Sequence, residues 1–189
     1  INYPPDRRYY YCNTNYLLLA SIVKKISGIE FKQYLKENIF SPIDMNNSIV
    51  YDRTNFNDLI MPTQGYENRT PWEDVYLNGV VGDKGVYSTT MDLLKFDRAL
   101  EKNLLINDSL KKLAFSKKNK DYNRNKNYGY GFRLKEHNKY GKIVYHTGWW
   151  KGYRSYYIKV LKNDQTIIIL NNVKRGRFLN IDKLIDLIN

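Results

Sequence analysis

Apolar and polar positions follow two different periods along this chain of 189 residues, and the period changes near residue 120. In about 14–38 and 89–115, apolar side chains recur every three or four positions, the spacing of helices that bury one face. From about residue 128 the period shortens to two, which is typical of half-buried strands. The pattern predicts an α+β fold in which an antiparallel β-sheet is flanked by helices.

Five helices are expected from start and stop signals. The first is capped by Thr14 and stopped by Gly28. The third opens with a capping box, in which the hydroxyls of 88–90 are followed by Asp92. The helices cover about 14–28, 30–38, 89–100, 108–115 and 179–188. The first is expected to bury a broad stripe of Leu17, Leu18, Ala20, Ser21, Ile22 and Ile26.

Four strands are predicted, over 128–134, 142–146, 153–161 and 165–170, with a tight turn at 162–164 between the last two. Residues 46–85 have no period and are rich in Asn, Gly, Pro and aromatic side chains. A connection of that length is usually functional, for example as one wall of a cleft. The sequence therefore predicts one domain, with a helical region at about 1–115 and a sheet with its closing helix at about 128–189.

Charge is uneven along the chain. Residues 1–100 hold 11 Lys and Arg against 12 Asp and Glu, whereas residues 101–189 hold 20 against 7. A nucleic-acid surface is one interpretation. The favoured one is that these cations, including the basic stretch 117–126, lie on solvated faces, and no nucleic-acid partner is expected. Attraction to anionic polymers of the cell envelope is a third use of the same charge.

Composition excludes several classes of protein. Cys12 is the only cysteine, so an internal disulfide and a cysteine-based zinc site are excluded. No apolar run approaches the roughly 20 residues that a membrane-spanning helix requires, so no transmembrane segment is expected in this chain.

Two short motifs carry the candidate chemistry: Tyr11-Cys12-Asn13 near the start and His146-Thr147-Gly148 in the predicted sheet. Each triplet alone is common. Together with the intervening stretches 34–45, 82–89 and 128–131, and in this order, they resemble serine β-lactamases and penicillin-binding proteins of the class C and D,D-carboxypeptidase type. The resemblance covers nearly the whole chain and corresponds to the C-terminal two-thirds or so of such a domain.

The resemblance implies a role for each motif residue. Tyr11 would be the acid/base of acyl transfer, although a phenol with a pKa near 10 needs nearby cations to act as a base. Asn13 and Thr147 would hold the substrate, and Gly148 would let it approach the strand. His146 would give electrostatic support as a cation or donor, and the backbone N–H of Trp149 would enter the oxyanion hole. No metal and no organic cofactor is implied.

The nucleophile of this family lies in a Ser-x-x-Lys upstream of the tyrosine motif. Two such tetrapeptides occur here, Ser21 to Lys24 and Ser109 to Lys112, but both follow Tyr11 in the chain. The catalytic serine and lysine are therefore expected on a missing N-terminal segment, together with the first strands of the sheet. That remainder of the domain is an expected partner, and this chain alone is expected to be inactive.

The expected function is that of an extracytoplasmic serine hydrolase, periplasmic or at the cell surface. It would act through an acyl-enzyme on a D-alanyl peptide of peptidoglycan, a β-lactam or a small ester. The alternative is a non-catalytic module of the cell envelope that keeps the fold and binds peptidoglycan or a partner. The absent Ser-x-x-Lys and the histidine in place of lysine in the second motif favour that alternative slightly.

Overall fold

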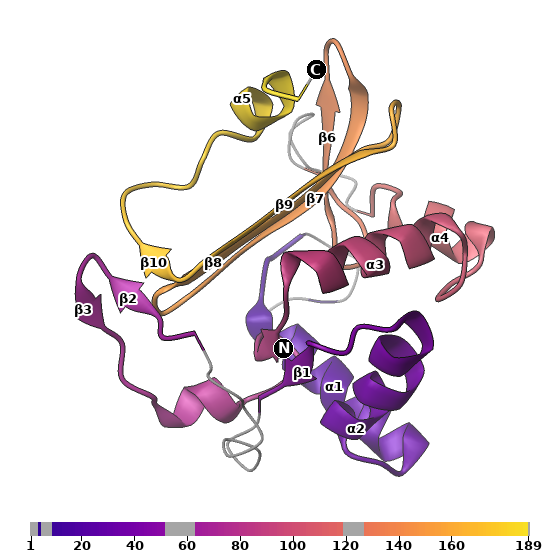
Figure 1. Cartoon of the computed structure of the whole chain (residues 1–189). Helices are drawn as coiled ribbons and strands as arrows, with labels where there is room; N and C mark the ends of the chain where they lie inside the picture. The colour runs from indigo at the N-terminus through magenta and orange to yellow at the C-terminus, as the bar shows by residue number, and fades with distance from the viewer. Residues whose placement is uncertain (1–3, 5–8, 52–62, 119–126, 189) are drawn as a thin grey trace.

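A computed structural model describes residues 4, 9–51, 63–118 and 127–188. Figure 1 shows long, twisted strands crossing the molecule, with helices on both sides of them. The main sheet is antiparallel, in the order β5-β6-β7-β8-β9. Its strands are β5 (Asn127–Tyr128), β6 (Arg133–His137), β7 (Gly141–Trp150), β8 (Tyr153–Val160) and β9 (Gln165–Asn171). The α+β fold expected from the sequence is confirmed.

Two strands differ from their predicted bounds. The strand expected over 128–134 is divided into β5 and β6, because Gly131 has a φ of 78° and the N–H of Gly129 donates to the carbonyl of Phe132, which closes a turn. The strand expected over 142–146 continues to Trp150, so the His146-Thr147-Gly148 motif lies inside β7. The turn between β8 and β9 is confirmed, with Asp164 in the left-handed region at a φ of 53°.

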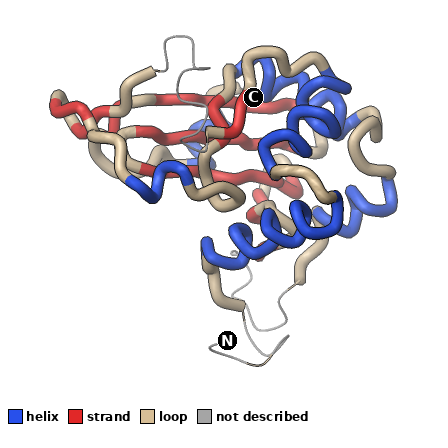
Figure 2. Tube along the Cα trace, turned by 90° about the horizontal axis from the view of Figure 1, so that it is seen from below, coloured by secondary structure: helices blue, strands red, loops and turns tan. Residues whose placement is uncertain are grey.

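The helices agree with the expected order, and Figure 2 shows them gathered largely at one end of the sheet. The second runs beyond its expected end at Asn38, because the chain continues through a wider π-helical turn and then a tighter 3-10 turn that begins with Ser41 and Pro42. Their bounds are α1 (Asn13–Ser27), α2 (Phe31–Leu35), η1 (Lys36–Phe40), η2 (Ser41–Ile43), α3 (Thr90–Glu101), α4 (Asp108–Ala114) and α5 (Ile181–Asp186).

The ends of α1 correct one expectation and confirm another. Thr14 does not cap the helix, because the helix already begins at Asn13 and Cys12 occupies the cap position. Gly28 ends it as expected, with a φ of 77° and its N–H donating to the carbonyl of Lys24.

The buried face of α1 is narrower than predicted. Ala20 is buried, whereas Leu18, Ile22 and Ile26 are exposed by 53%, 48% and 81%. A Cβ at Gly82 would lie 2.7 Å from the Cβ of Ala20, so the segment around Gly82 packs directly on this helix and selects its buried face. The expected stripe through Leu18, Ser21, Ile22 and Ile26 is therefore wrong for the described residues.

The start of α3 is capped by Thr89, whose hydroxyl accepts from the N–H of Asp92 at 3.1 Å. The carboxylate of Asp92 does not complete a capping box. It is fully buried and accepts from the N–H of Asn47 and the hydroxyl of Ser48, each at 2.8 Å. Asp92 thereby fastens α3 to the loop that follows η2.

The two faces of the main sheet carry different cores. On one face, α5 packs against β7 and β8 around Ile143, Ile158 and Ile185, none of which is exposed to solvent. On the other, α4 packs against β6 and β7 through Phe115, Leu134 and Val144. Because successive residues of a strand point to opposite faces, His146 lies on the same face as Val144.

A third core holds the helical region together. Phe40, Ile43, Met45, Val50 and Ala99 pack there with Leu93 and Phe96 of α3. A buried carboxylate also holds α3 on the sheet. Asp97 of α3 accepts hydrogen bonds from the side chains of Tyr157, Lys159 and Thr166 on β8 and β9. These contacts fix α3 across the face of the sheet that carries His146 (Figure 1).

The segment without a period, 46–85, forms only short elements, and 52–62 lie outside the described residues. These are β1 (Ile49–Val50), β2 (Tyr66–Glu67), β3 (Thr70–Pro71) and η4 (Tyr76–Gly79); beyond them, β1 pairs with β4 (Val86–Tyr87) and β2 with β10 (Val173–Lys174). With Trp150 and Tyr153 of the sheet, this segment lines a cavity of about 140 Å³. Its lack of period follows from elements of two to four residues, which are too short to show one.

Two further expectations concern charge and membranes. The basic stretch 117–126 is described only as far as Lys118, and the rest lies outside the described residues. Among the described helices, none combines the length and apolar character needed to cross a membrane.

Candidate active site

Tyr11 and His146, 135 positions apart in the sequence, lie side by side in the structure. Their ring centroids are 6.5 Å apart and their planes are inclined by 29°. Tyr11 stands just before α1, and β7 holds His146 on the face of the sheet against which α4 packs. The two motifs that the sequence singled out are thus brought to one place by the packing of the helical region on the sheet.

Tyr128 completes this aromatic group, and sequence reasoning did not single it out as a site residue. Its hydroxyl lies 2.9 Å from Nε2 of His146. Its ring meets the rings of Tyr11 and His146 edge-on, with 6.0 Å between centroids in each case. Burial, and then a hydrogen bond from Tyr16, raise the pKa of Tyr128 above its ordinary value, so it stays a neutral phenol. The sequence signal that could have identified Tyr128 is the Tyr-Gly-Tyr-Gly stretch at 128–131, which is part of the family resemblance.

The imidazole of His146 is neutral at physiological pH. Burial, and then the positive charge of Arg133, lower its pKa from 6.5 to about 4, against a smaller opposing effect of a backbone hydrogen bond at Thr147. Of the two roles expected for this residue, cation or donor, the structure favours a neutral hydrogen-bonding group. Whether Nε2 accepts from Tyr128 or donates to it depends on the tautomer.

Arg133 was also missed from the sequence, where it is one of many cations in the second half. Its guanidinium carbon lies 5.1 Å from the ring centroid of Tyr11 and 5.9 Å from that of Tyr128. Its Nε is buried and has no hydrogen-bond partner among the residues that the structure describes. The site thus contains a cation stacked on its tyrosines, and this cation supplies part of the field that keeps His146 neutral.

The end of β7 is open on one side. Strand β6 pairs with β7 only from Gly141 to Tyr145, whereas β8 pairs with it from Ile143 to Trp150. Across the described ranges, the stretch from His146 to Trp150 therefore has a strand partner on the β8 side alone. An edge of this kind exposes backbone N–H and C=O groups to which an extended ligand can bind.

The remaining expected site residues lie near this edge or at the start of α1. Gly148 faces Ser155 of β8, and a Cβ at Gly148 would lie 2.4 Å from the Ser155 hydroxyl oxygen. Thr147 pairs with Tyr156, and Trp149 is 53% exposed, with its indole N–H bound to the carbonyl of Lys151. Asn13 is the first residue of α1 and is exposed.

The lysine of each Ser-x-x-Lys lies beside a carboxylate on the surface. Lys24 is paired with Glu30, and Lys112 lies 2.6 Å from Asp108. The hydroxyl of Ser21 donates to the carbonyl of Leu17 within α1. Among the described residues, no group of three or more His, Cys, Asp and Glu side chains is arranged to hold a metal ion.

Comparison with known proteins gives a consistent result. The sequence model of the family described as Beta-lactamase matches residues 1–188. Penicillin-binding protein 4* of Bacillus subtilis (strain 168) is 32% identical over 187 residues, which cover 90% of this chain and 41% of that protein. A D-aminopeptidase of Gluconobacter oxydans (strain 621H) is 25% identical over 181 residues, covering 91% of this chain and 33% of the relative.

Among solved structures, the octameric penicillin-binding protein homologue from Pyrococcus abyssi has a TM-score of 0.78 at 22% identity, covering 91% of this chain and 40% of its own. At that identity the likeness shows the fold. The chain thus spans well under half the length of each of these three proteins.

Proposed function

Because this chain belongs to the Beta-lactamase family, we propose that it forms the substrate-facing part of a serine hydrolase that works through an acyl-enzyme. The observation that carries the proposal is the placement of Tyr11 against His146, with Tyr128 joining them, beside an open stretch of β7. A phenol, a neutral imidazole and an exposed strand edge in one place are parts that acyl transfer on a peptide-like substrate needs in addition to its nucleophile.

The proton transfers are assigned to Tyr11. As the serine oxygen attacks the carbonyl carbon, its proton passes to the phenolate oxygen of Tyr11, and the same proton is delivered to the leaving amine or alkoxide when the scissile bond breaks. The guanidinium carbon of Arg133 lies 5.1 Å from the ring centroid of Tyr11, so a positive charge stands beside the reacting phenol. Water then hydrolyses the acyl-enzyme by the reverse sequence of proton transfers.

Substrate binding is assigned to the open edge of β7 and the start of α1. The substrate lies along the stretch from His146 to Trp150, where Thr147 binds its carboxylate and Gly148 allows its backbone to come close. The backbone N–H of Trp149 is one donor of the oxyanion hole, and Asn13 binds the amide on the acyl side. His146, neutral and bonded to Tyr128, orients that phenol and lends hydrogen bonds rather than positive charge.

The nucleophilic serine and its lysine are assigned to a part of the protein outside residues 1–189. The lysines of both internal Ser-x-x-Lys tetrapeptides are paired with carboxylates, which supports this assignment. The apolar side chains that α1 leaves exposed, Leu18, Ile22 and Ile26, support it as well. A helix face of this kind is stabilised when another part of the same domain covers it.

The substrates proposed are a D-alanyl peptide, a β-lactam or a small ester, and the proposed location is outside the cytoplasm, by analogy with penicillin-binding relatives. The experiment uses the longest natural form of the protein and a fluorescent penicillin or fluorophosphonate that acylates active serines. We expect one labelled serine, and we expect Tyr11→Phe to slow labelling by about 100-fold or more. Tyr10→Phe, which changes the neighbouring exposed tyrosine, is the matched control and should label at the normal rate.

Equal labelling of wild type and Tyr11→Phe would overturn the role of Tyr11. If the protein is not labelled by either probe but still binds peptidoglycan fragments, the catalytic proposal fails and the non-catalytic module is the better description.

A further inference from the structure

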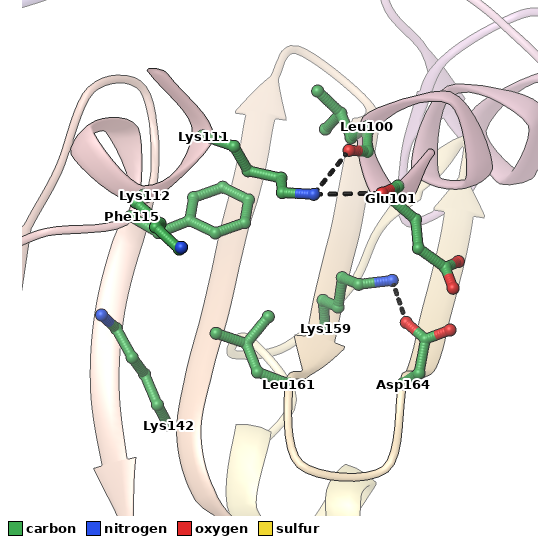
Figure 3. Close-up of a pocket in the computed structure, with 9 residues that line it drawn as sticks. All are labelled: Leu100, Glu101, Lys111, Lys112, Phe115, Lys142, Lys159, Leu161 and Asp164. Atoms are coloured by element: carbon green, nitrogen blue, oxygen red, sulfur yellow. Dashed lines mark hydrogen bonds and ion pairs between the residues drawn. The ribbon is translucent and has the colours of Figure 1, made fainter. Parts of the chain in front are cut away.

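A second cavity lies on the same face of the sheet as His146, but at the other end of β7. It has a volume of about 460 Å³, within the range of roughly 300 to 1,000 Å³ that is usual for small-molecule sites. Its walls come from the end of α3, from α4, and from the ends of β7 and β8, and Figure 3 shows the residues that line it. Four positions of β7, or roughly 13 Å of strand, separate its lining residue Lys142 from His146.

We propose that this cavity binds a small amphipathic anion, with its apolar body on Phe115 and Leu161 and its charged group at Lys142. The proposal does not depend on the hydrolase function, because none of the residues assigned to acyl transfer lines the cavity.

The floor of the cavity is apolar. Leu100, Phe115 and Leu161 line it, and Phe115 is at the same time part of the core that joins α4 to the sheet. In Figure 3, the ring of Phe115 and the side chain of Leu161 lie between two polar sides. An apolar ligand body gains free energy there by leaving water, at roughly 25 cal/mol for each Å² buried.

One polar side is neutralised internally. Glu101 is paired with Arg98 at 2.7 Å, and Asp164 is bound by Lys159 at 2.6 Å and by Arg98 at 3.0 Å. These carboxylates therefore have cationic partners already, and this side does not favour a cationic ligand.

The other side has uncompensated positive charge. Lys142 is partly buried, and across the described ranges its ammonium group has neither an ion pair nor a hydrogen bond. Lys112 ends on the same side (Figure 3), and its pairing with Asp108 is between exposed side chains one helical turn apart, which holds weakly. A ligand anion placed between the two lysines gains charge-assisted hydrogen bonds on a side of the cavity where no described carboxylate pairs with Lys142.

Lys111 of α4 links that helix to the end of α3 and so fixes one wall of the cavity. Its ammonium group donates to the carbonyls of Leu100 and Glu101 and to the side chain of Asn103, at 3.1, 3.0 and 2.6 Å. All three of its donors are used, so Lys111 serves to join the helices. A cavity whose wall is fixed in this way loses little conformational entropy when a ligand enters.

The test is isothermal titration of the full chain with octanoate and octyl phosphate, and with octylammonium as the probe of equal apolar length and opposite charge. We expect either anion to bind at least tenfold more tightly than octylammonium. Chemical-shift changes in NMR spectra should centre on Phe115 and Leu161.

Lysine variants identify which ammonium group binds the anionic group of the ligand. Lys142→Met keeps the length of the side chain and should weaken anion binding about tenfold, and Lys112→Met should weaken it less. Lys139→Met, which removes the same charge from the β6–β7 turn outside the cavity, is the matched control and should bind as the wild type does.

The proposal is overturned if octylammonium binds as tightly as the anions, or if neither Lys142→Met nor Lys112→Met changes anion binding. It is also overturned if the chain binds only vesicles that contain phosphatidylglycerol and no soluble anion, because a membrane surface would then be the partner.

Discussion

The hydroxyl of Tyr128 on β5 lies 2.9 Å from Nε2 of His146 on β7, and the ring of Tyr128 also meets that of Tyr11 just before α1. Both side chains are held in their neutral forms, because burial raises the pKa of the phenol and lowers that of the imidazole. The pair therefore forms a hydrogen bond between neutral groups. Protonation of the His146 imidazole lowers the free energy of unfolding.

The first prediction concerns the free energy of unfolding at acid pH. The pKa of His146 is about 4 in the folded chain and 6.5 without burial, so the unfolded chain takes up the proton first. The stabilisation that depends on neutral His146 is complete above pH 6.5 and is lost as the pH falls towards 4. Its size is roughly 3 kcal/mol. Urea unfolding between pH 4 and 7.5 measures it.

The comparison between variants isolates this residue from the carboxylates that titrate in the same range. His146→Gln should flatten the pH dependence, whereas His137→Gln, which changes the other histidine of the chain, should leave it unchanged. Arg133→Met should shrink the effect only in part, because burial is the larger cause of the shift. Equal slopes for wild type and His146→Gln would contradict the prediction.

The second prediction concerns the two carboxylates around Lys159. Asp97 is fully buried and also accepts from the hydroxyls of Tyr157 and Thr166, whereas the side chain of Asp164 is 42% exposed. Asp97→Ala should lower the free energy of unfolding by about 3 kcal/mol, because buried polar groups lose their acceptor. Asp164→Ala should lower it by less than about 1 kcal/mol.

Urea unfolding at neutral pH measures both changes. Each variant removes one carboxylate that pairs with Lys159, so the two differ mainly in the burial of that carboxylate. Similar losses for the two would show that the buried network contributes no more than a surface ion pair, and α3 would then be held by its apolar contacts alone.

Much of the fold follows from local signals in the sequence. The strand period, Gly28 and the Thr89 cap lie where their chemistry requires, because each depends only on near neighbours. The buried face of α1 could not be predicted, because Leu17, Leu18, Ala20, Ile22 and Val23 make the helix apolar on several sides. Contact with the distant segment at Gly82 decides which of those sides is buried.

The candidate site also contains residues that the sequence identified and residues that only the structure shows. The motifs identified Tyr11 and His146, whose neighbourhood the structure then provides. Arg133 and Tyr128 were not identified, because their importance lies in distances across the fold, 5.1 Å from Arg133 to the ring of Tyr11 and 2.9 Å from Tyr128 to His146. Arg133 is one cation among many and carries no local mark of such a role, and the Tyr-Gly-Tyr-Gly stretch marks Tyr128 only as part of the family resemblance.

The third prediction separates the structural role of Gly148 from its proposed role in substrate binding. A Cβ at Gly148 would lie 2.4 Å from Oγ of Ser155 on β8 but 3.7 Å from its Cβ, which is an ordinary contact. Gly148→Ala should therefore cost about 1 kcal/mol of unfolding free energy, because the hydroxyl must move. Adding Ser155→Ala removes the collision and should recover most of that loss.

The double variant then tests function without the stability defect. If Gly148 is needed for close approach of the substrate to β7, the longest natural form carrying both changes should be as stable as the Ser155→Ala variant and still be acylated more slowly than it by fluorescent penicillin. Recovery of the labelling rate together with stability would limit Gly148 to a packing role opposite Ser155. Failure to recover stability would mean that the added methyl group disturbs the β7 backbone itself, contrary to the geometry of the pair.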